Sequence, residues 1–155
     1  MEFSSYLKNE FYKIERQLEK IEKLLCNNEE IAPILTSYFI VYVCGIYENI
    51  VEELFIQRAR KTEDREIENF MSAFMNRYFR TPNYEQIQKL IKMLKGRDYS
   101  IRVEQKSIDA LGSLVNNRHK VAHGEYSNAT LNDCKMWHEN AKKIFEKIEE
   151  ILLKG

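Results

Sequence analysis

The sequence predicts an all-α protein, an antiparallel bundle of five or six helices. Apolar residues recur at helical spacing along most of the 155-residue chain. Five Gly and two Pro are too few for a protein built from many turns and short strands. Hydrophobic residues make up 44% of the chain and charged residues 31%, as in a folded domain with a real core. We therefore expect a single domain over residues 1–155.

The first two helices have different apolar patterns. In residues 3–26 the apolar side chains form one narrow seam, with Glu and Lys on the other faces. A second helix is expected from about Glu30 to Lys61, with Pro33 tolerated in its first turn. Its uncharged run, residues 31–47, is shorter than the ~20 residues that a membrane span needs and leads into Glu48. We expect this run to be the buried central helix of the bundle and not a membrane anchor.

The remaining helices are shorter, and a residue that caps or breaks a helix bounds each of them. We expect them at roughly 64–80, at Tyr84–Lys95, from Ser100 or Ile101 to His123, and from Thr130 onwards, with Thr130 as the cap of the last helix. The last helix is expected to bury Trp137, Ala141, Ile144, Ile148 and Ile151.

Charge and cysteine content bear on nucleic-acid binding and on the redox compartment. The 24 basic and 24 acidic residues cancel, so the chain has no overall electrostatic attraction for nucleic acid. Residues 86–123 carry 8 basic and 3 acidic side chains, a local net charge of +5. This charge allows a local attraction for nucleic acid, or the basic residues simply lie on a solvated helix face. Three cysteines at wide spacing, without a secretory signal, predict buried free thiols in a reducing cytoplasm. They are Cys26, Cys44 and Cys134.

The most informative stretch is Asn116–Gly124, NNRHKVAHG. Arg118 falls three residues after Val115, so it continues the apolar stripe that buries its helix. A guanidinium there needs a partner, an interface or a ligand, because an unpaired buried charge is costly. Gly124 is expected just past the helix end, which places His123 in the last turn. An Arg suited to phosphate and a His that exchanges protons near neutral pH indicate phosphodiester chemistry.

Arg118, four intervening residues and His123, at a helix end in a small all-α chain, resemble the signature of the HEPN superfamily. In that signature a polar residue often follows the Arg, and here it is His119. The long apolar second helix with the acidic Glu48 also fits, and the whole pattern is most similar to the RiboL-PSP-HEPN type. The resemblance implies a metal-independent endoribonuclease without a cofactor. It also implies a homodimer, often a toxin or effector of prokaryotic conflict systems.

The resemblance implies catalytic roles for Arg118 and His123. On a regular helix the two lie ~140° apart in direction and ~7.5 Å apart along the axis. A twofold axis would therefore pair Arg118 of one protomer with His123 of the other. RNA supplies its 2′-hydroxyl as nucleophile, His123 acts as general base or acid, and Arg118 stabilises charge on the phosphate. His119 and Asn117 are candidates for orienting the phosphate or His123, and Glu48, by analogy, for holding Arg118.

We expect a cytoplasmic homodimer that acts on RNA, with a cognate antitoxin or a larger defence protein as partner. Two alternatives remain open. If Arg118 is a structural anchor paired with Glu48, and His123 only caps its helix, the chain is a non-catalytic HEPN dimer. Such a dimer would serve as an interaction or nucleotide-binding module, or as an antitoxin.

The second alternative is a zinc site, although we expect no metal. Two i,i+4 pairs on adjacent helices offer four ligands: His119, His123, Cys134 and His138. Against a zinc site, Cys134 fits into the apolar spacing of the last helix, where its thiol would lie in the core, and the ligand spacing matches no known zinc module.

Overall fold

The computed structural model describes residues 4–155, which fold into six α-helices without a strand. These are α1 (Ser5–Leu25), α2 (Ala32–Arg60), α3 (Arg65–Tyr78), α4 (Tyr84–Lys95), α5 (Gln105–Ala122) and α6 (Leu131–Glu149). A 3₁₀ turn, η1 (Glu29–Ile31), precedes α2, and a π-helical turn, η2 (Glu150–Lys154), extends α6. The predicted all-α bundle is confirmed. Position 3, where the first helix was expected to begin, lies outside the described residues.

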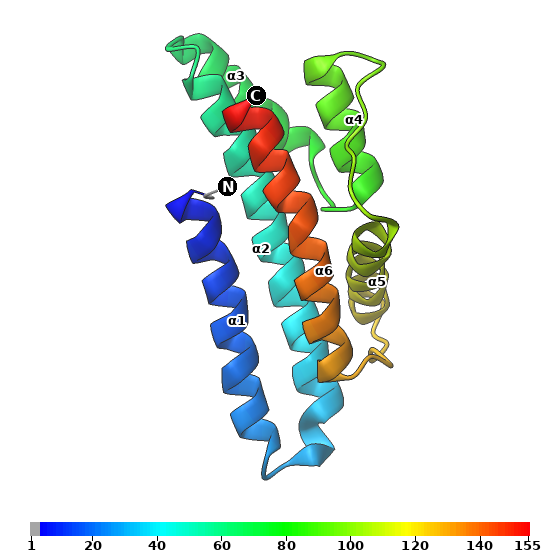
Figure 1. Ribbon diagram of the computed structural model, residues 1–155. Helices are drawn as coiled ribbons and strands as arrows, with labels where there is room; N and C mark the ends of the chain where they lie inside the picture. Colours follow the sequence, from blue (N-terminus) through cyan, green and yellow to red (C-terminus); the bar gives the residue numbers. More distant parts are fainter. Residues whose placement is uncertain (1–3) are drawn as a thin grey trace.

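Helix α2 is the centre of the bundle. It packs against α1, α3, α5 and α6, and α5 also packs along α6. In Figure 1 the long helices α1, α2 and α6 run side by side, and the start of α1 and the end of α6 lie towards the same end of the bundle. Phe39, Tyr47 and Phe55 of α2 are fully or almost fully buried, because neighbouring helices cover most of its circumference.

By length and composition alone, Glu29–Arg60 could cross a membrane. Its most apolar window is 56% buried inside the bundle, as expected for a core helix. The structure therefore agrees with the predicted buried role of α2.

Side-chain caps set the start of four helices, because they satisfy backbone N–H groups that have no partner within the helix. Ser4, Asp64, Asn83 and Thr130 each accept such a bond. At α6 the cap is reciprocal: the Asp133 N–H donates to the Thr130 hydroxyl (3.1 Å) and the Thr130 N–H to the Asp133 carboxylate (2.9 Å). The predicted Thr130 cap is confirmed.

The predicted start of the fifth helix at Ser100 or Ile101 is wrong, since α5 begins at Gln105. Side chains of α4 bind the backbone of the loop that joins α4 to α5. The Tyr84 hydroxyl donates to the Ile101 carbonyl (3.0 Å), and the Ile101 N–H donates to the Gln88 side-chain oxygen (2.9 Å). Once these groups are bound across the bundle, they are no longer free for helical hydrogen bonds.

The core contains one buried polar pair and two of the three thiols. This pair joins two rings: His138 is only 1% exposed, and its Nδ1 lies 2.7 Å from the Tyr47 hydroxyl. Burial is the main cause that lowers the pKa of His138 to about 4, so the ring is neutral at pH 7. Cys44 and Cys134 are buried as predicted. The prediction for Cys26 is wrong, because this residue is exposed where α1 ends.

Candidate functional site

The carboxyl end of α5 closes in a left-handed turn that fixes the position of His123. Gly124 has φ +80°, a conformation that L side chains adopt only with strain. The Gly124 N–H donates to the Val121 carbonyl (3.0 Å) and the Glu125 N–H to the Lys120 carbonyl (2.9 Å), the two bonds of a Schellman motif. His123 is therefore the C-cap residue, directly after the last helical residue Ala122. The predicted end of the helix at Gly124 is confirmed.

Arg118 lies on the face of α5 that packs against α2. The buried residues of this helix are Ser107, Ala110, Leu111, Leu114 and Val115. One turn further on, Arg118 continues the same face and forms an ion pair with Glu48 of α2. The structure thus brings together the two residues for which the sequence suggested a contact.

The Arg118–Glu48 pair stands at the edge of the core. The side chains are 27% and 23% exposed, so water still reaches both charges. Cys44, one turn before Glu48 on α2, also lies beside the guanidinium. Burial raises the pKa of this thiol to about 12, although Arg118 acts in the opposite direction. Cys44 is therefore a neutral thiol at pH 7 and not an activated nucleophile.

His119 and His123 take no part in this pair. Both are exposed, and because they are four residues apart they share one face of α5. The His123 imidazole makes no hydrogen bond or ion pair with residues 4–155; only its backbone N–H is engaged, with carbonyls of the preceding turn. Within one chain, Arg118 and His123 consequently lie on different sides of α5.

Asn117 holds the loop that follows the motif. Its side-chain N–H donates to the Ser113 carbonyl (2.8 Å), and its side-chain oxygen accepts from the Ser127 hydroxyl (2.7 Å). The Ser127 N–H in turn donates to the Ser37 hydroxyl on α2 (3.3 Å). These bonds fix the path of the chain from His123 to α6. Both ends of the Asn117 amide are used in them, so this side chain has a structural role.

Comparison with known protein families gives a match over most of the chain. The family model RiboL-PSP-HEPN matches residues 9–154. The chain belongs to this HEPN family. No curated protein and no solved structure shows significant similarity to it. Membership of the HEPN family supports a role in RNA cleavage or nucleotide binding.

The Arg118–His123 segment lies outside the groove between α3 and α4. This groove has a volume of about 670 Å³, and its lining residues, all between Phe70 and Met93, include neither Arg118 nor His123.

The positions of the four side chains do not support the four-ligand zinc alternative. His119 and His123 are exposed on α5, whereas Cys134 is fully buried in the core and His138 Nδ1 is bonded to Tyr47. Among residues 4–155, these four side chains form no common cluster of ligand atoms.

Three features near the motif were not identified from the sequence. Cys44 contacts Arg118, Ser37 anchors the loop through Ser127, and Tyr126 projects from that loop into solvent. The i,i+4 spacing of Cys44 and Glu48 on α2 was the available signal for the first. The contact of Ser37 with Ser127 joins residues 90 positions apart and has no local signature.

The Arg118–Glu48 contact predicts energetic coupling. In a double-mutant cycle of Arg118→Ala and Glu48→Ala, followed by urea unfolding, we expect a coupling energy of about 1 kcal/mol. Each single change leaves a half-buried charge without its partner, so the double variant should lose less stability than the sum of the two. Additive losses would contradict the contact.

Proposed function

We propose that this HEPN domain is a metal-independent endoribonuclease whose active site forms between two protomers. The observation that carries the proposal is the separation of the motif within one chain. Glu48 fixes Arg118 against α2, while His123 projects from another face of α5 with a free imidazole. A twofold axis near the end of α5 would place Arg118 of one protomer opposite His123 of its partner.

The residues present suffice for cleavage that uses the RNA's own 2′-hydroxyl. His123 removes the proton from that hydroxyl or delivers one to the leaving 5′-oxygen, and water takes part in the other proton transfer. Arg118 stabilises negative charge on the phosphate oxygens. The products are a 2′,3′-cyclic phosphate and a 5′-hydroxyl. Glu48 acts as a positioning residue, since it limits the rotamers open to the Arg118 side chain. His119 lies on the same face as His123 and is a candidate contact for the phosphate.

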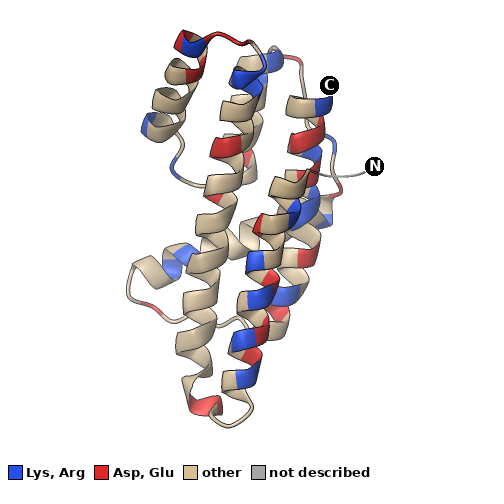
Figure 2. Ribbon diagram, turned by 90° about the vertical axis from the view of Figure 1, so that its left-hand side faces the viewer, with Lys and Arg blue, Asp and Glu red and all other residues tan. Residues whose placement is uncertain are grey.

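The exposed face of α2 is the surface that we assign to the dimer. Ile34, Tyr38 and Val41 are 53%, 50% and 44% exposed, and they share one face of the helix. Figure 2 shows this uncharged length of α2 as a tan ribbon facing the viewer. On the helical wheel the face borders Glu48, so a partner seated on it would also meet the edge of the Arg118 site.

In the cell, we propose that the protein acts as a cytoplasmic toxin or antiviral effector, restrained by a cognate antitoxin or a larger defence protein. A second candidate function is a non-catalytic HEPN dimer that binds a protein or a nucleotide. The observation in its favour is that Glu48 already neutralises Arg118, as a structural anchor would require.

The proposal predicts RNA cleavage in EDTA. Wild-type protein incubated with total RNA should give fragments with cyclic phosphate ends. His123→Ala should cleave about 10²–10⁴ times more slowly, because it lacks the general acid or base. Asn116→Ala, a change at an exposed position of the same helix, serves as the control and should keep wild-type activity. A folded, dimeric wild type that leaves RNA intact would favour the non-catalytic module.

The assigned dimer surface predicts that Val41→Glu produces monomers. A carboxylate in an apolar interface loses water without gaining a partner, so association should weaken at least tenfold. The matched control is Ile67→Glu on α3, where an apolar residue of the same 44% exposure lies off the proposed surface. Sedimentation analysis distinguishes the two variants. If Val41→Glu stays dimeric, this surface is not the interface.

A further inference from the structure

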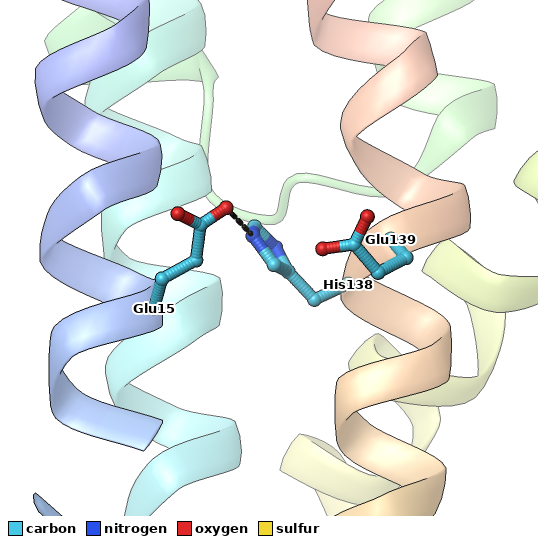
Figure 3. A group of neighbouring side chains, drawn as sticks. All are labelled: Glu15, His138 and Glu139. Atoms are coloured by element: carbon cyan, nitrogen blue, oxygen red, sulfur yellow. Dashed lines mark ion pairs between the residues drawn. The ribbon is translucent and has the colours of Figure 1, made fainter. Parts of the chain in front are cut away.

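One buried nitrogen is left without a hydrogen bond. His138 of α6 is 1% exposed, and its Nε2 has no hydrogen-bond partner among the described residues. Leaving a buried polar atom unpaired costs free energy, so such an atom in a folded protein calls for an explanation. Figure 3 shows the imidazole in the space between α1 and α6, facing Glu15.

Two carboxylates lie beside this nitrogen, one from each helix. The Glu15 Oε1 atom of α1 is 3.8 Å from His138 Nε2, too far for a hydrogen bond. Glu139 follows His138 on α6 and directs its carboxylate to the same region (Figure 3). One potential ligand atom from each residue lies within 4.8 Å of the others.

We propose that Glu15, His138 and Glu139 form a binding site for a divalent transition-metal ion, with Zn²⁺ as the ion to test. One imidazole nitrogen and two carboxylate oxygens suit Zn²⁺, whereas Mg²⁺ and Ca²⁺ prefer oxygen ligands alone. Ligand atoms around a tetrahedral Zn²⁺ are about 3.3 Å apart, so closing the site needs side-chain movements of only about 1 Å. Water would supply the fourth ligand.

The histidine is held in place and the carboxylates are accessible. Tyr47 binds Nδ1 at 2.7 Å, and the Phe11 ring contacts the imidazole edge-on, with the ring centroids 5.7 Å apart. When Nδ1 carries the hydrogen and donates it to the Tyr47 oxygen, the lone pair of Nε2 points towards the carboxylates. Both Glu side chains are partly exposed, which gives an ion a path from solvent.

Lys142 already brings a positive charge to this site. Its Nζ lies 2.8 Å from Glu139 Oε2 and 3.8 Å from Glu15 Oε1, so the ammonium bridges the two carboxylates. A metal ion would have to displace this ammonium. The proposal therefore makes Lys142 a competitor, and removing its charge should strengthen metal binding.

The test is calorimetric titration of EDTA-treated, dialysed protein with ZnCl₂, together with thermal unfolding. Wild type should bind one ion per chain, and its melting temperature should rise by about 5 °C or more at ~100 times Kd. Glu15→Gln, which keeps the shape of an accessible side chain, should bind at least tenfold more weakly. Glu19→Gln, one turn further along α1, is the matched control and should bind as wild type does. Lys142→Met should bind more tightly.

The exposed His119 and His123 pair on α5 is the main source of unrelated zinc binding. A double His119→Ala, His123→Ala variant should keep the bound ion if the site is at His138. The proposal is overturned if wild type binds no Zn²⁺, if Glu15→Gln binds as tightly as wild type, or if the α5 double variant abolishes binding. The ion has no part in the proposed RNA cleavage, so the two proposals can fail separately.

Discussion

The ion pair between Arg118 and Glu48 joins the motif helix α5 to the central helix α2. It lies where the uncharged length of α2 ends, and Glu48 is the first charged residue of that helix. Because both side chains remain partly open to water, the pair avoids most of the desolvation penalty of a fully buried one. Under the proposed function, the exposed part of the Arg118 side chain, 27% of it, is the part that a phosphate would contact.

Helical geometry then constrains what a single chain can do. With Arg118 directed at α2, His123 five residues later must emerge on a different side of α5. The glycine turn at Gly124 and the serine bonds of the following loop hold that histidine at the surface. Under the proposed function, a second protomer supplies the missing half of the site, and the apolar face of α2 next to Glu48 supplies the surface on which it sits.

Much of this arrangement follows from local rules that the sequence displays. The seam of α1, the Thr130 cap, the glycine after His123 and the uncharged α2 each predict their own element, because the determining residues are close together in the chain. The start of α5 was missed because Gln88 and Tyr84, more than ten positions away, bind the backbone around Ile101. Within the candidate site, the contact of Arg118 with Glu48 was suggested by analogy, whereas the bonds that join Asn117 and Ser37 to Ser127 depend on tertiary placement.

An active site shared between two protomers is tested most directly by mixing two inactive variants. Arg118→Ala and His123→Ala would each be purified as dimers, then mixed, allowed to exchange subunits and assayed on RNA. Half of the resulting dimers are mixed, and each of these contains one site with both residues intact, so about a quarter of wild-type activity should return. A mixture that exchanges subunits but stays as inactive as its components would contradict a site shared between protomers.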